Sequence, residues 1–581
     1  MTKKATAKTS KTRGGEAAET AKTAKRASKA AETTASRAGP PAPKGRGGEA
    51  ASGTIDLRYS LAELPSSQHR AGLAGLVLMV RWLERQPKSQ RKGTCAIASL
   101  DAKGLALTID EAGLASLFDL VYKASAEEQA YPAPFKNKDP LRTEVQESVV
   151  TDKAGKDKVK SKTVYIYPVT VPDGAFLTDW DKTHSKSKPG LWVKLWRDMV
   201  WGILRGVPAT RRPFELRADG EPTSDAADTW ADLRRGDRSV DLPSTYYLGA
   251  QSSTAELVAF KDRARYQFLL HFWPFVAQIY VPQVLNNEGK LDHAGYGIAV
   301  PDVANLAEFC LEIADALQSR SDDDNALAGY RPRGCLIDLS VEGGLDLFRR
   351  LKAQIQRREG QRATGDLVLG VDVFHMEKEG NNVRVRGVAR VDPDESLVDA
   401  YGRVRGTLWS PVFRRQRIAN LIAQRPWHHG FDRVFATTPW KQTIDNDYFK
   451  HDARLLFKEF ADMTEASDNE NTPLETILYR LVGAYISRKI ENKYGVKYGK
   501  QMPEEELAKY REYREKVARD AFLAIRSRTG VDFVDYFTGT LCSVPQHMRE
   551  ADFNFLSRAL LNDAQRDEIR TLTLLALSAR G

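Results

Sequence analysis

The residues best suited to metal-assisted chemistry are acidic side chains in the alternating segment DLVLGVDVFHMEKEGNNVRVRGVARV, at 366–391. Its pattern predicts a β-hairpin, and its candidate acids are Asp366, Asp372, Glu377 and Glu379. Carboxylates on adjacent strands can bind Mg²⁺ for phosphoryl transfer, which makes a metal-dependent nuclease one hypothesis. Across the turn, however, cross-strand ion pairs with the acids are open to Arg384, Arg386 and Arg390. We therefore expect solvated, arginine-paired acids and no catalytic residue, with the nuclease as an alternative.

A second group of possible metal ligands lies at Trp427-His428-His429-Gly430-Phe431-Asp432, with Asp445, Asp447 and His451 further along. Imidazole and carboxylate groups are common ligands of transition metals. Two adjacent histidines on a helix or strand point in different directions, so a shared ion would need an irregular turn. We interpret the segment as a structural or partner-contacting loop, and we expect neither a metal nor another cofactor.

The sequence lacks the signatures of several enzyme classes. It contains no P-loop, GxSxG, HExxH or spaced Cys/His zinc pattern, so ATP hydrolysis, acyl transfer and simple zinc hydrolysis lack their usual signals. The four cysteines are at least 25 residues apart and form no CxxC pair, which is typical of a reducing cytoplasm. We expect a non-catalytic cytoplasmic protein.

The strongest nucleic-acid-binding signal is a basic insertion at about 131–217, in which residues 136–217 carry 17 Lys+Arg and 10 Asp+Glu. The pattern predicts a long hairpin, and its lysine-rich tip contains Lys153, Lys156, Lys158, Lys160 and Lys162. A spacing of two residues would place the last four on one side of a strand, as an edge that follows phosphates. A solvated loop is the alternative. Nearby, Asn137 stands between Lys136 and Lys138 in a Pro-flanked loop, where an amide could read a base edge while the lysines hold phosphates.

Three further groups of basic residues are candidate phosphate contacts. The first is Arg211 with Arg212. The second, with Trp409 available to stack on a base, comprises Arg403, Arg405, Arg414, Arg415 and Arg417. The third is a basic ridge beside an apolar helical stripe and comprises Arg488, Lys489, Lys493, Lys497 and Lys500. A ridge of this kind can also be an ordinary solvated face.

The pattern of helix and strand signals around these residues predicts an α+β multidomain body at 53–455. Ser66 and Ser67 can cap a helix through QHRAGLAGLVLMVRWLER, which is apolar nearly all round and so belongs in the core. TCAIASLDAKGLALTID then predicts two strands around a turn at 101–104, and EAGLASLFDLVY predicts a helix. Before the body, residues 1–52 contain no aromatic residue and no Leu, Ile or Val, which predicts a disordered basic tail.

An all-α C-terminal bundle is expected at 463–581, after a linker that includes Asp462-Met463. Thr472-Pro473-Leu474-Glu475 predicts a capping box with proline at the first helical position. A second long helix opens at Pro503 and stops near Gly530, and the segments near 531–541 and 552–579 are also expected to be helical. Together these helices predict an antiparallel bundle.

The length of the chain predicts several domains, and its net positive charge favours an anionic partner. At 581 residues the chain exceeds what one hydrophobic core usually serves. The net charge is +10, but residues 1–52 hold 12 Lys+Arg against 4 Asp+Glu. The tail therefore accounts for 8 of the 10 charges and leaves a nearly neutral body. No apolar run approaches the roughly 18 residues that a membrane span needs, so no membrane partner is expected.

At YSLAELPSSQHRAGLAGLVLMVRWLE, residues 59–84, the chain resembles the N-terminal helix region of the large subunit of type I CRISPR Cascade surveillance complexes, in the branch near types I-A and I-B. The resemblance extends over 55–581 through the order of the parts, an α+β body with basic insertions and then helices ending in FNFLSRALLNDAQRDEIRTLTLLALSAR. The basic tail is not part of the family pattern.

The resemblance implies a subunit near the 5′ handle of the guide CRISPR RNA that recognises the protospacer-adjacent motif in target double-stranded DNA, stabilises the R-loop and recruits an effector. The implied partners are the guide RNA, the target duplex, the displaced strand, other Cascade backbone and handle-binding subunits, and a helicase–nuclease or, in transposon-borne systems, a transposition adaptor. The bundle would correspond to a fused small subunit, with Met463 as a possible separate start. Sequence reading would be left to the guide RNA. A free-standing nucleic-acid-binding protein is a further alternative.

Overall fold

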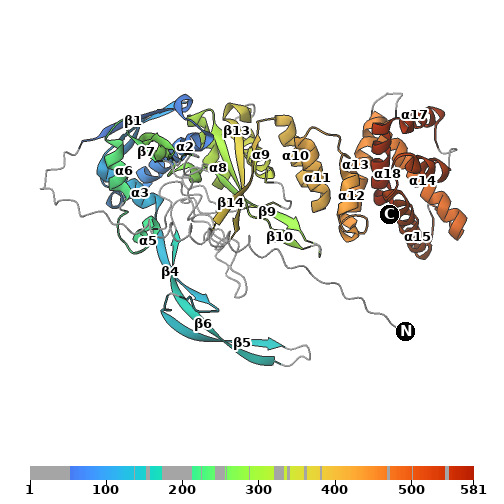
Figure 1. Ribbon diagram of the computed structural model, residues 1–581, viewed down its shortest axis with the longest axis horizontal. Coiled ribbons are helices and arrows are strands. Elements are labelled where there is room, and N and C mark those ends of the chain that lie inside the picture. Colours follow the sequence, from blue (N-terminus) through green and yellow to red (C-terminus); the bar gives the residue numbers. More distant parts are fainter. Residues whose placement is uncertain are drawn as a thin grey trace, which may run out of the picture. The chain divides into compact units, whose positions relative to one another are not determined.

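The computed structural model of the protein describes residues 53–581 except 137, 152–156, 173–211, 224, 242–255, 257, 287, 289, 319–332, 336–339, 359–362, 380–381, 467–471, 500 and 544–547 (Figure 1). The predicted basic tail at 1–52 therefore lies outside the described residues, as does much of the predicted basic insertion.

The first sheet consists of β1 (Ile55–Ser60), β3 (Gly104–Ile109) and β2 (Cys95–Leu100), in this order and antiparallel. The predicted turn between β2 and β3 is confirmed, because Asp101 Oδ1 accepts hydrogen bonds from the next backbone N–H groups, including that of Gly104 at 2.9 Å. Strand β1 was not predicted from the sequence. The predicted helix α3 (Glu111–Val121) follows, with Asp110 as its N-cap.

The predicted core helix is α2 (Ser67–Arg85), and the side chain of Ser66 caps it by accepting from the backbone N–H of His69. Every residue from 71 to 80 is buried. Gly72 and Gly75 bring α2 against α7 (Ala264–Leu269) and the residues after it, since a Cβ at either position would clash with a backbone carbonyl there. Close backbone approach thus requires both glycines.

The largest sheet has the order β10 (Leu291–His293), β9 (Gln278–Leu285), β11 (Tyr296–Val303), β13 (Val368–Glu379) and β14 (Asn382–Val391), and β12 (Arg333–Cys335) pairs parallel with β9. The hairpin predicted at 366–391 is confirmed as β13 and β14. Its register sets Asp372 opposite Arg390 and Glu377 opposite Arg384. Because β11 is the other neighbour of β13, the hairpin is an integral part of this sheet.

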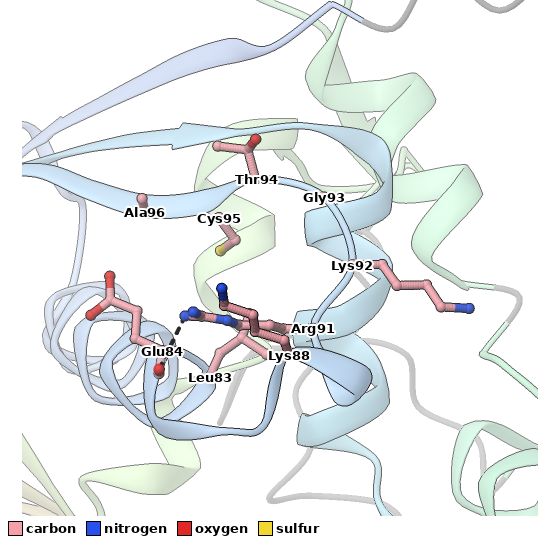
Figure 2. A pocket seen from close by; sticks show the side chains of 9 residues that line it. All are labelled: Leu83, Glu84, Lys88, Arg91, Lys92, Gly93, Thr94, Cys95 and Ala96. Carbon is pink, nitrogen blue, oxygen red and sulfur yellow. Dashed lines mark hydrogen bonds between the residues drawn. The ribbon is translucent and has the colours of Figure 1, made fainter.

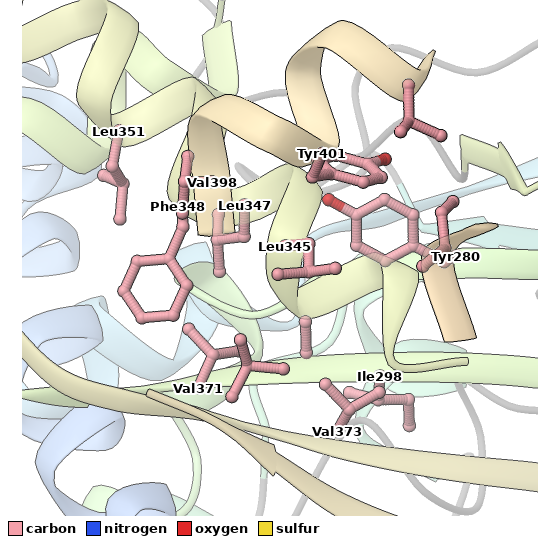
Figure 3. Packing of buried hydrophobic residues seen from close by; sticks show 14 of the residues in the cluster. Tyr280, Ile298, Leu345, Leu347, Phe348, Leu351, Val371, Val373, Val398 and Tyr401 are labelled. Carbon is pink, nitrogen blue, oxygen red and sulfur yellow. The ribbon is translucent and has the colours of Figure 1, made fainter. Parts of the chain in front are cut away.

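Two helices cover opposite faces of the sheet. Ser67 Oγ of α2 donates to Asp372 Oδ2 at 2.5 Å, whereas a Cβ on Gly344 of α9 (Glu342–Arg358) would lie 3.1 Å from the side chain of Val373. Adjacent strand positions point to opposite faces, so α2 and α9 lie on different sides. Figure 3 shows α9 leucine and phenylalanine side chains facing Val371 and Val373, with Tyr401 beside Tyr280. Tyr401 belongs to α10 (Glu395–Thr407).

The predicted basic hairpin is confirmed as β5 (Arg142–Thr151) paired antiparallel with β6 (Asp157–Pro172). A third strand, β4 (Ala124–Tyr131), pairs with the other edge of β6 and was not predicted. The three strands run side by side in the order β4-β6-β5 (Figure 1). Helix α5 (Arg212–Ala218) packs against β4 and β6.

Four further helices and strands lie in the first part of the described chain. They are α6 (Asp225–Leu233), β7 (Ser239–Asp241), β8 (Lys261–Arg263) and α8 (Leu306–Gln318). None of the helices in the described ranges combines the length and the apolar character needed to cross a bilayer.

The described chain after Val391 is helical. Its helices after α10 are α11 (Pro411–Ile422), α12 (Phe431–Thr437), α13 (Asp447–Ala466), α14 (Leu474–Tyr494), α15 (Glu504–Arg526), α16 (Gly530–Tyr536), α17 (Glu550–Leu561) and α18 (Asp563–Arg580). The predicted fold class, an α+β part followed by a helical part, is thereby confirmed.

Two details of the predicted bundle are wrong. Met463 and Asp462 lie within α13 and not in a linker. The residues of α13 before them belong to the bundle core, because Phe449 and Phe457 are fully buried and α13 packs on α18. The predicted capping box is also absent: Pro473 is the N-cap of α14, and no side chain caps the helix. Instead, Glu475 Oε1 accepts from Trp427 Nε1 at 3.2 Å.

Candidate nucleic-acid interface

The Pro-flanked loop before β5 is held on the three-stranded sheet by aromatic rings. Phe135 stacks on Tyr167 of β6 with ring centroids 4.3 Å apart and lies 4.7 Å from Tyr131 of β4. The Tyr167 hydroxyl also accepts from the backbone N–H of Phe135 at 2.9 Å. Lys136 and Lys138 are exposed on this anchored loop. The predicted base-reading residue between them, Asn137, lies outside the described residues.

The register of β6 leaves its lysines without acidic partners directly across the sheet. Lys158, Lys160 and Lys162 lie opposite Val150, Ser148 and Gln146 of β5. On β5, Arg142 lies 2.7 Å from Glu144 of the same strand, and it also lies 2.6 Å from Glu128 of β4. Directly opposed charges are the pairs that interact most strongly, and the register places no acid directly opposite these three lysine positions. The other two tip lysines, Lys153 and Lys156, lie outside the described residues.

The Arg211-Arg212 pair is only partly described. Arg212 is exposed and is the first residue of α5, and Arg211 lies outside the described residues. Further along the same helix, Arg217 approaches Asp119 to 3.6 Å.

Arg405 is part of an internal ion network. Its Nη1 lies 3.2 Å from Asp346 Oδ1 and 3.6 Å from Glu342 Oε1, and it donates to the Tyr401 hydroxyl at 2.7 Å. The carboxylates are 0% and 1% exposed. Burial raises the pKa of Glu342, and Arg405 opposes this rise. Arg405 therefore links α9 to α10 and is engaged inside the protein.

The other arginines of this group divide by exposure. Arg414 is 5% exposed, and burial lowers its pKa. Burial also lowers the pKa of Arg417, to about 10, against the opposing effect of Glu459. Arg403 and Arg415 are exposed. The geometry thus retains Arg403 and Arg415 as surface candidates, because a buried guanidinium offers little surface to a phosphate.

Trp409 forms an exposed aromatic platform with residues of α13. Its ring is stacked on that of His451 at 4.7 Å and 14°, and Tyr448 meets it edge-on at 5.9 Å. Trp409 is 57% and Tyr448 56% exposed. The fully buried Asp452 carboxylate accepts from the backbone N–H groups of Trp409 and Ser410, at 3.0 and 2.7 Å. These bonds fix the backbone under the platform.

The predicted ridge on α14 is exposed where it is described. Arg488, Lys489 and Lys493 are exposed on the helix, and Lys497 is exposed just beyond it. Arg488 approaches Glu491 to 3.3 Å. Lys500 lies outside the described residues. The ridge is open to a partner, as an ordinary solvated helix face would also be.

Two of the four candidate acids, Asp372 and Glu377, are paired with arginines as we expected. Asp372 lies 3.3 Å from Arg390, and Glu377 lies 2.7 Å from Arg386. Asp366 is exposed in a short 3-10 turn before β13, and Glu379 pairs with Asn382 at the hairpin tip. The acids are thus dispersed along the hairpin.

The histidine segment does form an irregular turn, with Gly430 at φ +79°, but its side chains have different partners. His428 Nε2 lies 3.1 Å from Glu568 Oε1, and His429 Nε2 lies 3.1 Å from Arg425 Nη1. His451 stacks on Trp409, and two of the acids pair with arginines, Asp432 with Arg570 and Asp445 with Arg519. Among the described residues, no three His, Cys, Asp or Glu side chains are grouped so that they could hold a metal ion.

Our sequence reasoning missed a basic pocket of about 600 Å³ between the end of α2 and the start of β2. Its lining includes Lys88, Arg91 and Lys92 (Figure 2). The signal was available, since the sequence RQPKSQRK at 85–92 contains four cations and no acid.

Two protein-family models match the chain. Residues 94–361 match the type I-B CRISPR Cas8b N-terminal domain, and residues 368–580 match the type I-B CRISPR Cas8b C-terminal domain. The boundary between the two matches falls inside the largest sheet, because β11 of the first match pairs with β13 of the second. A comparison with curated proteins found no match.

Proposed function

Because the chain belongs to the type I-B CRISPR Cas8b family, we propose that it recognises the protospacer-adjacent motif in duplex DNA and helps to open the duplex for the guide RNA. Family membership makes it the large subunit of a Cascade complex, which works with a CRISPR RNA and target DNA. Large subunits of this kind are generally non-catalytic. Sequence specificity then comes from base pairing with the guide, and the protein contributes motif and backbone contacts.

The β4-β6-β5 sheet supports this proposal most directly. It combines a loop fixed by Phe135 and Tyr167 with lysine positions on β6 that have no acid across the strand pair. An anchored loop can present side chains to a groove with little loss of conformational entropy, while lysines hold phosphates. In this proposal Lys136 and Lys138 lie beside the motif, and Lys158, Lys160 and Lys162 follow the adjacent backbone.

The helical part is proposed to stabilise the R-loop. Trp409 offers an aromatic surface for an unpaired base, and exposed cations for the backbone are present at Arg403 and Arg415 and along the α14 ridge. Stacking combined with phosphate binding is the usual way in which proteins hold single strands without reading them. Binding of the 5′ handle of the guide RNA and recruitment of a helicase–nuclease or transposition adaptor complete the proposed role.

The decisive experiment measures duplex binding by the reconstituted complex. Converting Lys158, Lys160 and Lys162 to Ala is expected to weaken target binding and to lower the slope of log K against log salt by about 0.9 for each phosphate that the variant no longer neutralises. A matched control converts three exposed lysines elsewhere, Lys103, Lys441 and Lys458. An unchanged salt slope in the hairpin variant would remove the sheet from the DNA interface.

Two rival functions have their own readouts. The isolated chain, without guide RNA or other subunits, is expected to bind target duplex weakly and without sequence preference. Tight, sequence-specific binding by the isolated chain would favour a free-standing DNA-binding protein. Mg²⁺-dependent cleavage that is abolished by Asp372→Ala would favour a nuclease.

A further inference from the structure

The pocket at the end of α2 contains cationic, acidic and apolar groups. Figure 2 shows the Lys88 and Arg91 side chains together beneath Cys95, the Glu84 carboxylate on the other side near Ala96, and the Lys92 side chain extending away. Arg91 Nη1 donates to the Glu84 carbonyl oxygen at 3.0 Å, which holds the guanidinium at the helix end. The pocket therefore has a cationic side, a carboxylate and an apolar wall.

The loop that forms this pocket is fixed to α3. The Lys92 backbone N–H donates to Ser116 Oγ at 2.8 Å, and Ser116 Oγ donates to the Lys92 carbonyl at 3.0 Å. The Thr94 N–H donates to Asp110 Oδ2 at 2.8 Å. Gly93 has φ +71°, and a Cβ there would clash with Asp110. A basic loop that is held at so many points before any ligand binds is preorganised, which lowers the entropy cost of binding.

The pocket is larger than a simple anion requires. A volume of about 600 Å³ is within the range of pockets for small organic ligands. Leu83 is 3% exposed, and burial raises the pKa of the Cys95 thiol to about 12. The thiol is therefore neutral at physiological pH and contributes a small apolar surface beside Leu83 and Ala96.

We propose that this pocket binds one unpaired nucleotide of a nucleic-acid strand, with its phosphate at Lys88 and Arg91 and its base against Leu83, Cys95 and Ala96. The Glu84 carboxylate then accepts a hydrogen bond from an exocyclic amino group, as acidic side chains do with cytosine N4. A base without an amino group, such as uracil, would leave this acceptor unused. The inference rests on the proposed function in one respect, that the strand belongs to RNA or DNA bound by the complex.

The test uses the full chain and fluorescently labelled 12-nucleotide probes, with anisotropy as the readout. The probes are oligocytidine and oligouridine in RNA form, their deoxy counterparts dC and dU, and an abasic strand. Wild type is expected to prefer the cytosine strand over the uracil strand about five-fold in RNA, DNA or both, which identifies the source of the nucleotide. Glu84→Ala is expected to abolish this preference.

Two further variants separate phosphate binding from base binding. Lys88→Ala is expected to lower the salt slope for a single strand by about 0.7, the value for one neutralised phosphate. Its matched control is Lys103→Ala, which removes the same charge from an exposed lysine that does not line the pocket. Ala96→Trp fills the pocket and is expected to reduce binding of the cytosine strand to that of the abasic strand. Thermal unfolding checks that each variant is folded.

The inference is overturned if cytosine and uracil strands bind alike in both RNA and DNA form, or if Ala96→Trp and Lys88→Ala bind as wild type does. If the hairpin variant of the complex also shows weakened duplex binding, the nucleotide-binding role of the pocket is rejected and the proposed function is kept. An intact pocket preference with an unaffected hairpin variant would keep the pocket and remove the β4-β6-β5 sheet from the DNA interface.

Discussion

Two arginine- and lysine-rich regions that look alike in the sequence have different surroundings in the fold. Between 403 and 417, three of the five arginines are at least partly withdrawn from solvent, and Arg405 is bound to carboxylates of α9. On β6, the described lysine positions face neutral residues across the sheet. The comparison teaches that a cluster of cations in the sequence does not reveal which of its charges are bound to acids inside the protein.

The largest effect on stability is expected from Arg405 and the buried carboxylates that it contacts. Arg405→Ala leaves the buried carboxylates of Glu342 and Asp346 with fewer partners, so we expect a decrease of about 3 kcal/mol in the free energy of unfolding. The exposed Arg403 is the matched control, and Arg403→Ala should change stability by less than about 0.5 kcal/mol. Urea denaturation of the two variants measures both. Equal decreases in the free energy of unfolding would show that Arg405 contributes no more to stability than the exposed Arg403 does.

A smaller effect is expected at the outward-facing aromatic platform beside these arginines. Trp409→Ala should weaken binding of the displaced strand by about 2 kcal/mol, because one base is deprived of its stacking surface. Trp440 is a matched control, since it is 40% exposed but lies under the Arg526 guanidinium, 5.6 Å from the ring centroid. The measurement is the affinity of the complex for a labelled single strand, compared between Trp409→Ala and Trp440→Ala. If both variants bind equally weakly, the platform has no special role.

The loop that Phe135 anchors on the β4-β6-β5 sheet provides the next comparison. Phe135→Ala removes its stacking on Tyr167 and should weaken binding of motif-containing duplex by about 1 kcal/mol. The salt slope should stay constant, because no lysine is removed. Val145→Ala, at a 65% exposed position on β5, is the control. A lowered salt slope in Phe135→Ala would mean that the loop acts mainly by placing the lysines.

The smallest effect is expected in the pH dependence of the free energy of unfolding, through the buried Glu342 that lies beside Arg405. Burial raises the pKa of Glu342 above its ordinary value, so the folded state binds this proton more tightly than the unfolded state does. Stability from this group is therefore greatest below the ordinary glutamate pKa and falls as pH rises through the window up to the raised pKa. Glu342→Gln should flatten this part of the stability profile in urea denaturation between about pH 4 and pH 8. An identical profile would show that Arg405 fully offsets the burial of the carboxylate.

Much of the local structure was predictable from pattern alone. The apolar stretch after Ser66 predicted α2, and the alternating segment at 366–391 predicted β13 and β14. The strands β1 and β4 escaped prediction because each pairs with a strand that is not the next one in the chain, so no hairpin turn marks the pair. Of the predicted nucleic-acid residues, the fold turned Arg405 and Arg414 inward, while the pocket lined by Lys88 and Arg91 was not foreseen.

The sequence by itself determined the type and order of the elements, because caps, glycines and hydrophobic periods act over a few neighbouring residues. Only the tertiary structure decided where charges and boundaries lie. Arg405 meets Asp346 from 59 positions away, and α13 continues through Met463 because its earlier residues are buried against α18. Such partners are set by which distant faces pack together, and no local pattern encodes that choice.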